Sequence, residues 1–285
     1  MDQLSQQNGQ PHPKEQAISV NGKTYRVLTD GDGVPLVLLH GFTGSSETWL
    51  PFFPVFRRAF RLVAVDLPGH GQTVCPDDPQ LYRMEQVCDD LLALLDRLGI
   101  DTFHLLGYSM GGRVALHVAL AAPDQVRTLT MESASPGIAD AGERAARRRQ
   151  DERLAQQLEE NGIQWFVSYW EELPLFASQK RLPESVRQQI RRQRLRQRPQ
   201  GLACSLRGMG AGVQEALHER LPELTMPVLL LTGQLDEKYH RLAEWMQTRI
   251  SRCRWVSVPD TGHTVHVEKP DAFVEVVWSF LQAWT

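Results

Sequence analysis

A serine stands between two glycines in the run GYSMG at residues 107–111, after an apolar segment and before a helical one. Glycines two positions to either side allow a sharp turn from strand to helix, which exposes the serine hydroxyl beside free backbone N–H groups. The alternative is a tight turn with a chemically unused serine, and the flanking segments disfavour it. Ser109 is therefore the predicted catalytic hydroxyl.

A serine hydroxyl is inert alone and needs a basic histidine, which in turn needs an acid to orient it. In chains with this kind of elbow the order is serine, acid, histidine. Asp236 follows the apolar run 228–232, and His263 follows the run 254–258. Both therefore stand in loops at the carboxyl ends of predicted strands, where open α/β sheets carry their sites. The predicted catalytic triad is Ser109, Asp236 and His263.

Neighbouring residues offer alternatives for the acid and the base. Glu237 and Asp260 are the other acids, but Asp260 lies only three residues before His263 on the same predicted loop. His266 is a rival base, but it lies three residues into the next segment and lacks a preceding glycine. These positions favour Asp236 and His263.

Backbone donors for an oxyanion hole are expected after the first long apolar run, which ends in His40, Gly41 and Phe42. In this architecture the loop after that strand supplies one N–H group, and the residue after the nucleophile supplies the other. Phe42 and Met110 are the predicted donors. Losing one such donor typically costs about 10²–10³ in rate. A plain strand end and turn at His40 and Gly41 is the alternative.

The elements that must position these residues alternate between strands and helices. Continuous apolar runs are typical of strands buried on both faces of a parallel sheet, and the segments between them have helical spacing. A hairpin around Asn21 and Gly22 opens the series. We predict strands at 17–20, 23–28, 35–40, 62–66, 103–107, 126–131, 228–232 and 254–258, and helices at 84–98, 110–122 and 272–284. The fold class is α/β, an α/β-hydrolase fold with a mostly parallel sheet and helices on both faces.

One long stretch breaks the alternation. Residues 136–221 lack a buried-strand pattern and are rich in Arg, Gln, Glu, Leu and Trp at helical spacing. We interpret them as a helical lid inserted between two strands of the sheet. The predicted organisation is a flexible tail at 1–16, a core formed by 17–135 and 222–285, and a lid at 136–221. The polar tail lacks the pattern of a secretory signal.

Composition narrows the classes of partner. A chain of 285 residues with a net charge of −3 suits one large domain and shows no basic character that would indicate nucleic acid. No run approaches the roughly 18 apolar residues that a membrane span needs. The four cysteines form no close pair of the kind that binds zinc or performs redox chemistry. We expect a cytoplasmic enzyme without metal, membrane or nucleic-acid partner. The oligomeric state stays open, and a monomer fits.

Several segments resemble one family. The runs GYSMGGR at 107–113 and MESASPG at 131–137 resemble the SHCHC synthases, or 2-succinyl-6-hydroxy-2,4-cyclohexadiene-1-carboxylate synthases, of menaquinone (vitamin K2) biosynthesis. The runs WEELPLF at 170–176, GLACSLRGMG at 201–210 and TGQLDEK at 232–238 add to the likeness. Many hydrolases share the elbow, so the lid segments and the segment 132–137 discriminate.

The resemblance implies a lyase that needs no metal or organic cofactor. Such an enzyme eliminates pyruvate from 2-succinyl-5-enolpyruvyl-6-hydroxy-3-cyclohexene-1-carboxylate. In the family the serine, activated by histidine and aspartate, is thought to act as the base, a role that falls on Ser109 here. The oxyanion that forms would bind at Phe42 and Met110.

The implied substrate is a polycarboxylate, and guanidinium groups bind carboxylates through paired hydrogen bonds. Most arginines of the lid are expected on solvated helix faces. Arg113 is better placed, since it follows Ser109 by four residues on one helix face. Arg207 lies in a family-like run, and Arg148 is a third candidate. The predicted substrate-binding residues are His40, Tyr108, Arg113, Arg148, Trp170 and Arg207.

Two other functions fit parts of this pattern. A carboxylesterase or carbon–carbon hydrolase would use Ser109 as a nucleophile and admit water, and a serine-reactive inhibitor would trap it covalently. A small-ligand receptor would bind without turnover, but the complete triad weighs against it. The lyase is the preferred interpretation.

Overall fold

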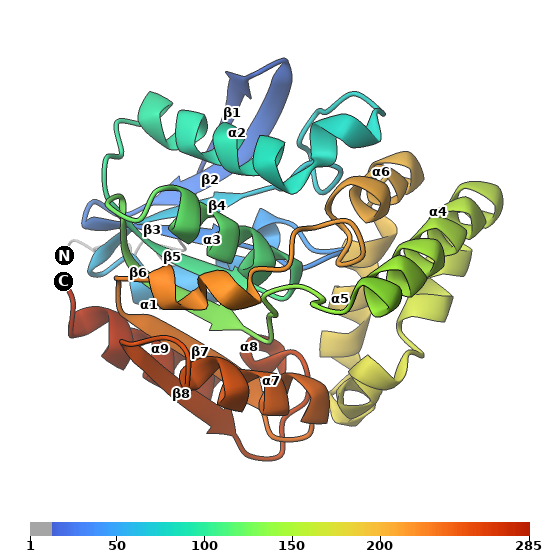
Figure 1. The fold of residues 1–285 in the computed structure, drawn as a ribbon. Coiled ribbons are helices and arrows are strands. Elements are labelled where there is room, and N and C mark those ends of the chain that lie inside the picture. The colour runs from blue at the N-terminus through green and yellow to red at the C-terminus, as the bar shows by residue number, and fades with distance from the viewer. Residues whose placement is uncertain (1–12) are drawn as a thin grey trace, which may run out of the picture.

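The computed structural model describes residues 13–285 and contains an eight-stranded sheet in the order β1-β2-β4-β3-β5-β6-β7-β8 (Figure 1). The first strands pair antiparallel, and every pair from β4 to β8 is parallel. The strands are β1 Lys14–Val20, β2 Lys23–Asp30, β3 Val34–Leu39, β4 Phe60–Val65, β5 Phe103–Tyr108, β6 Val126–Glu132, β7 Val228–Gly233 and β8 Cys253–Val258. The predicted α/β class and mostly parallel sheet are confirmed.

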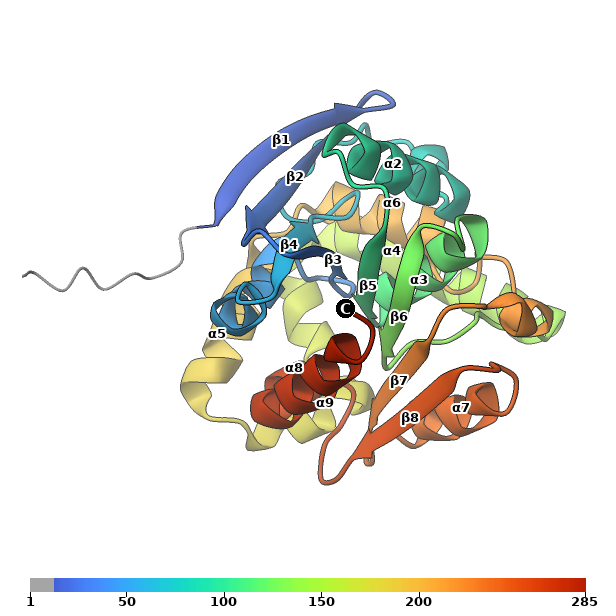
Figure 2. The same ribbon diagram turned by 90° about the vertical axis from the view of Figure 1, so that its left-hand side faces the viewer.

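Helices cover both faces of the sheet (Figure 2). One apolar cluster joins one sheet face to α2, α3 and α7, and a second joins the other face to α1, α8 and α9. The helices are α1 Phe53–Phe56, α2 Met84–Arg97, α3 Met110–Ala121, α4 Ala141–Trp170, α5 Glu184–Leu195, α6 Pro199–Met209, α7 Glu237–Gln247, α8 Val265–Glu268 and α9 Pro270–Gln282. The central strands β5 and β7 are buried along their whole length, which explains their unbroken apolar runs.

The prediction of a tail up to residue 16 is wrong at its end. Strand β1 begins at Lys14, and Lys14, Glu15 and Gln16 pair with residues of β2. These residues are polar and largely exposed because β1 is an edge strand, so no apolar pattern marks them. The rest of the predicted tail, residues 1–12, lies outside the described residues.

The predicted lid region contains helices α4, α5 and α6 and the short 3-10 helices Pro174–Arg181 and His218–Glu223, with no strand between Gly137 and Leu221. Helices α4 and α6 pack on each other through small apolar clusters that also reach Phe42 of the core. Leu217 and Leu221 instead belong to the main core cluster, so the core resumes before residue 221. No described helix is both long and apolar enough to cross a bilayer.

A buried ion pair fastens the opening hairpin to α2. Asp90 and Lys23 are both almost inaccessible to solvent and contact each other directly. Asp90 also accepts hydrogen bonds from the Tyr25 hydroxyl (2.6 Å) and the Asn21 side-chain amide (2.9 Å). The carboxylate therefore satisfies the two buried donors of the hairpin, Lys23 and Tyr25, which would otherwise lack a partner.

We predict that Asp90→Ala lowers the free energy of unfolding by about 3–5 kcal/mol, because it leaves the Lys23 ammonium group buried and unpaired. Urea denaturation followed by circular dichroism measures this. The matched control is Asp89→Ala, since Asp89 is the exposed neighbour on the same helix. Equal losses in the two variants would contradict the prediction.

Candidate active site

Ser109 lies at the turn between β5 and α3. Its backbone has φ 51° and ψ −106°, a conformation that residues other than glycine rarely adopt. The glycines on either side of Ser109 allow backbone segments to pass very close to one another. A Cβ atom on Gly107 would lie 2.2 Å from the Gly111 carbonyl oxygen, and one on Gly111 would lie 2.3 Å from that of Leu39. Backbone strain of this kind persists only where the surrounding structure enforces it. The predicted elbow is therefore present.

The structure brings Ser109, His263 and Asp236 together. His263 Nε2 lies 3.0 Å from Ser109 Oγ, and His263 Nδ1 lies 2.6 Å from Asp236 Oδ2. The carboxylate accepts a hydrogen bond from Nδ1–H, so Nε2 is left as the acceptor that faces the serine hydroxyl. His263 and Asp236 are both buried. The geometry is that of a serine whose proton can pass to an oriented imidazole.

The rivals for the acid and the base are engaged elsewhere. Asp260 pairs with Arg181 on the surface at 2.7 Å. Glu237 is exposed and forms an ion pair with the next turn of α7. His266 Nδ1 contacts the buried carboxylate of Glu132 at 2.9 Å. None of these three groups takes part in the contacts around Ser109.

Glu268 holds the loop that carries His263. One of its carboxylate oxygens accepts from the Gly262 N–H group (2.8 Å) and the other from the Thr264 N–H group (3.3 Å). The Leu235 N–H group also donates to the Thr261 carbonyl at 2.8 Å, which ties this loop to the one that carries Asp236. The acid and the base are therefore fixed relative to each other through the backbone.

The two predicted oxyanion donors, Phe42 and Met110, both line the cavity at Ser109. Phe42 lies in a four-residue turn that the Gly44 N–H group closes by donating to the Gly41 carbonyl oxygen (3.0 Å). Because a trans peptide holds its C=O and N–H in one plane on opposite sides, bonding of Gly41 O sets the direction of the Phe42 N–H group. Met110 is the first residue of α3, where the N–H groups lack helical partners.

His40 acts on this same peptide and not on substrate. Its Nδ1–H donates to the Gly41 carbonyl oxygen (2.8 Å), and its Nε2 accepts from the Leu67 N–H group (3.0 Å). Burial lowers the pKa of His40, which keeps the ring neutral and this hydrogen-bond pattern intact. The prediction that His40 binds substrate is wrong, because both ring nitrogens are engaged by backbone groups inside the core.

Three of the other predicted substrate-binding residues line the cavity at Ser109: Tyr108, Arg113 and Trp170. Arg113 donates to the Met209 carbonyl oxygen (2.8 Å) and contacts the Gln214 side-chain oxygen, but no carboxylate of the described residues lies within 4 Å. Desolvation lowers the pKa of Arg113 to about 10. Trp170 packs edge-on against Phe42 and has a buried indole N–H group without a partner in the described structure.

Arg148 and Arg207 do not reach this cavity. Both line a separate hollow beside α4 and α6, and Arg207 is bound by the carboxylates of Glu152 and Glu159. Successive residues of a helix point about 100° apart, so Leu206 faces the site while Arg207 turns away. For the same reason Arg147 lines the site and the predicted Arg148 does not.

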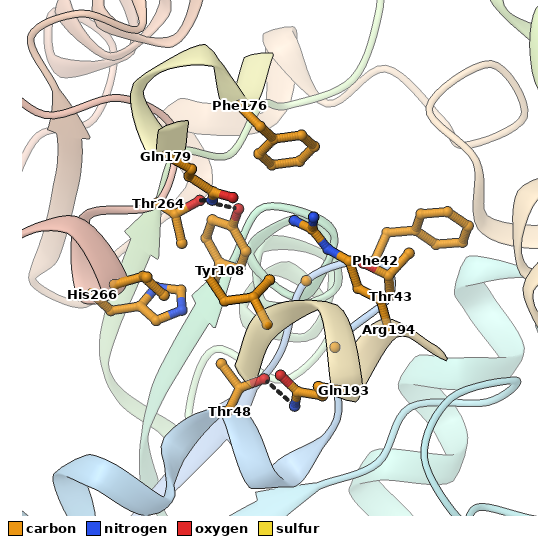
Figure 3. A pocket seen from close by; sticks show the side chains of 14 residues that line it. Phe42, Thr43, Thr48, Tyr108, Phe176, Gln179, Gln193, Arg194, Thr264 and His266 are labelled. Atoms are coloured by element: carbon orange, nitrogen blue, oxygen red, sulfur yellow. Dashed lines mark hydrogen bonds between the residues drawn. The ribbon is translucent and has the colours of Figure 1, made fainter. Parts of the chain in front are cut away.

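A second hollow, shown in Figure 3, shares Phe42, Tyr108 and Phe176 with the cavity at Ser109. Its most notable residue is Arg194 of α5, which is 7% exposed and lies over the Phe176 ring at 5.0 Å. Figure 3 shows the guanidinium group pointing into the hollow. No carboxylate within the described range pairs with it, and burial lowers the pKa of Arg194.

Sequence reasoning missed Arg194, Arg147, Lys238 and Tyr239, which all line one of these two hollows. Arg194 stands in a run of arginines and glutamines in which no residue is marked out by type. Its burial depends on how α5 sits on the core. The TGQLDEK run did include Lys238, so that residue could have been named from its place two positions after Asp236.

Comparisons with known proteins show which family the chain belongs to. The model of the alpha/beta hydrolase fold family matches residues 34–270. A Bacillus subtilis (strain 168) protein, to which the activity of 2-succinyl-6-hydroxy-2,4-cyclohexadiene-1-carboxylate synthase is provisionally assigned, is 41% identical over 92% of this chain and 96% of its own length. The enzyme of that name from Pectobacterium atrosepticum is 32% identical over 86% of this chain and 93% of its own length.

Solved structures give the same result. The structure of MenH from S. aureus superposes with a TM-score of 0.87 at 37% identity and covers 91% of this chain and 98% of its own. A Thermogutta terrifontis esterase, solved with malate bound, has a TM-score of 0.83 at 25% identity, over 96% of this chain and all of its own. The chain therefore belongs to the 2-succinyl-6-hydroxy-2,4-cyclohexadiene-1-carboxylate synthase family, within the alpha/beta hydrolase fold.

Proposed function

We propose that this chain eliminates pyruvate from 2-succinyl-5-enolpyruvyl-6-hydroxy-3-cyclohexene-1-carboxylate to give 2-succinyl-6-hydroxy-2,4-cyclohexadiene-1-carboxylate in menaquinone biosynthesis. The observation that carries the proposal is the 41% identity to a relative with this assigned activity, over nearly the full length and including the lid. The site supports it, because a triad and an oxyanion hole adjoin two guanidinium groups that lack a carboxylate partner in the described structure.

The first chemical step is removal of a proton. Ser109 Oγ, polarised by His263 Nε2 at 3.0 Å, takes the proton from the ring carbon that carries the succinyl group. The serine proton passes to His263, and Asp236 stabilises the resulting imidazolium through the 2.6 Å contact. The electron pair of the broken C–H bond moves toward the neighbouring succinyl ketone, whose oxygen becomes negatively charged.

The second step expels the leaving group. The Phe42 and Met110 N–H groups stabilise the oxyanion without reorganising, because their positions are fixed by the turn and by the start of α3. Collapse of this charge through the ring double bond breaks the carbon–oxygen bond to the enolpyruvyl group and leaves the conjugated diene. The released enolpyruvate takes up a proton and becomes pyruvate. No water is consumed, so the reaction is an elimination.

Substrate charge is the role proposed for Arg113 and Arg194. The substrate is a polycarboxylate. An unpaired guanidinium group in a hollow has lost hydrogen bonds to water, and a ligand carboxylate can replace them. Arg113 lines the cavity at Ser109, and Arg194 lines the second hollow, which shares Phe42 and Tyr108 with that cavity. The two cations would hold separate carboxylates with the reacting ring between them. Tyr108 and Trp170 supply the aromatic walls.

The carboxylesterase alternative uses the same triad with Ser109 as nucleophile, and esterases are among the structural neighbours. It is not favoured, since identity to the synthases is higher and extends through the lid. The cytoplasmic location and the lack of a cofactor stay predictions, and the oligomeric state stays open.

We expect the wild type to release pyruvate from the enolpyruvyl substrate and Ser109→Ala to lose about 10³-fold or more in kcat, because the variant lacks the group that takes the proton from the ring carbon. Lactate dehydrogenase coupled to NADH oxidation measures the release. Ser185→Ala, on the exposed face of α5, is the control and should retain wild-type activity. Hydrolysis of aryl esters without pyruvate release would make the chain an ordinary hydrolase.

Arg113→Met and Arg194→Met should each lower kcat/KM by about 10- to 100-fold, mainly through KM, because each removes a charged hydrogen bond to the substrate. Arg148→Met and Arg207→Met are the controls and should change KM by less than about threefold, since both side chains lie outside the two hollows. The assignment fails if the controls lose as much as the Arg113 and Arg194 variants.

A further inference from the structure

The turn that aims the Phe42 N–H group contains a second strained residue. Thr43 has φ 69°, a left-handed value that a β-branched side chain rarely adopts. It occupies the third position of the turn closed by Gly44 N and Gly41 O, where a positive φ normally selects glycine or asparagine. Left to itself, this residue favours a negative φ, which would rotate the peptide between Phe42 and Thr43 and so displace the backbone of the oxyanion donor Phe42.

A lid residue contacts this turn directly. Gln197 lies between α5 and α6 and is 4% exposed. Its side-chain nitrogen donates to the Thr43 carbonyl oxygen (3.3 Å) and to the Gly44 carbonyl oxygen (3.0 Å). Its side-chain oxygen accepts from the Gly71 N–H group at 2.9 Å. The donors and acceptors around it fix the orientation of the amide, because the reversed orientation would face N–H toward N–H and oxygen toward oxygen.

A second glutamine of the same lid segment strengthens the contact. Gln193, one helical turn earlier, donates to Ser45 Oγ and Thr48 Oγ1, each at 3.0 Å, and Figure 3 shows the contact with Thr48. The lid segment from Gln193 to Gln197 thus lies along the loop from Thr43 to Thr48. Its hydrogen bonds to the core here reach the segment that directly follows the oxyanion donor Phe42.

We propose that Gln197 is a positioning residue for the oxyanion hole. Its amide holds Thr43 and Gly44 in the strained turn, and the turn in turn directs the Phe42 N–H group toward the reacting oxygen. The lid therefore contributes to the chemical step as well as to enclosure of substrate. This inference rests on the proposed function only for its steady-state assay, because the hole can also be tested through Ser109 itself.

The test begins with Gln197→Ala and the isosteric Gln197→Glu, which keeps the acceptor for Gly71 but loses the donor to the two carbonyls. Both should lower kcat for pyruvate release by about 10- to 100-fold, less than complete removal of a donor, with KM changed by less than about threefold. Gln188→Ala is the matched control, since Gln188 of α5 is exposed and, among residues 13–285, its side chain bonds only to Glu184.

Rescue by Thr43→Gly separates positioning from a general loosening of the lid. Glycine adopts a positive φ without penalty, so the turn no longer needs an external restraint. In the Thr43→Gly background, Gln197→Ala should therefore cost less than about threefold in kcat. A KM rise with unchanged kcat, or an undiminished kcat loss in that background, would overturn the proposal.

A covalent probe keeps this test independent of the proposed reaction. In an alkyl phosphonofluoridate, attack by Ser109 Oγ forms a P–O bond, expels fluoride and passes the serine proton to His263, while the phosphoryl oxygen enters the oxyanion hole. The labelling rate, followed by mass spectrometry, should fall about 10-fold or more in Gln197→Ala and stay at the wild-type value in Gln188→Ala. Equal labelling rates would refute the positioning role, whether or not the wild type releases pyruvate.

Discussion

The register of the parallel strands is the constraint on which the whole site depends. Leu39 of β3 pairs with Gly107 of β5, and further along the sheet Gly233 of β7 pairs with Val258 of β8. The strands therefore end at one edge, and the loops that follow them meet there. A slip of one residue in any pair would move a reactive group by about 3.3 Å and invert the face of its strand. The backbone ladders between neighbouring strands, fixed by the helices and loops at both ends of each strand, hold this alignment.

Strain and desolvation are concentrated at this edge. Ser109 and Thr43 both adopt positive φ, while Arg113 and Arg194 lie in hollows without a carboxylate partner among the described residues. Each of these features opposes folding. Each persists because the surrounding structure fixes the conformation or position of the residue. Natural chains tolerate such local conflicts mainly where function requires them. Their coincidence here is a physical signature of a site, independent of any relative.

Features of the site that depend on a few neighbouring residues could be predicted from the sequence, whereas those that depend on tertiary packing could not. The elbow at Ser109 and the order of the acid and the base depend on short patterns beside strands, so they could be read from the chain. The arginines could not, because helix rotation and ion pairing decide their direction: Glu152 and Glu159 take Arg207 away from the site, whereas α5 buries Arg194 against the core. The role of His40 depends on hydrogen bonds between residues far apart in sequence.

Helix α4 is interrupted at Gly162, where φ 78° and ψ 178° break the helical geometry. The segment before this break carries Arg147, and the segment after it carries Phe166 and Trp170. The two segments nevertheless share one apolar cluster, in which Leu158 before the break joins Phe166 and Val167 after it on Leu202 of α6. The break therefore redirects the chain without uncoupling the two halves of the lid. A substitution in the aromatic wall is transmitted through this cluster to the segment that carries the charged residue, so the two parts of the lid evolve together.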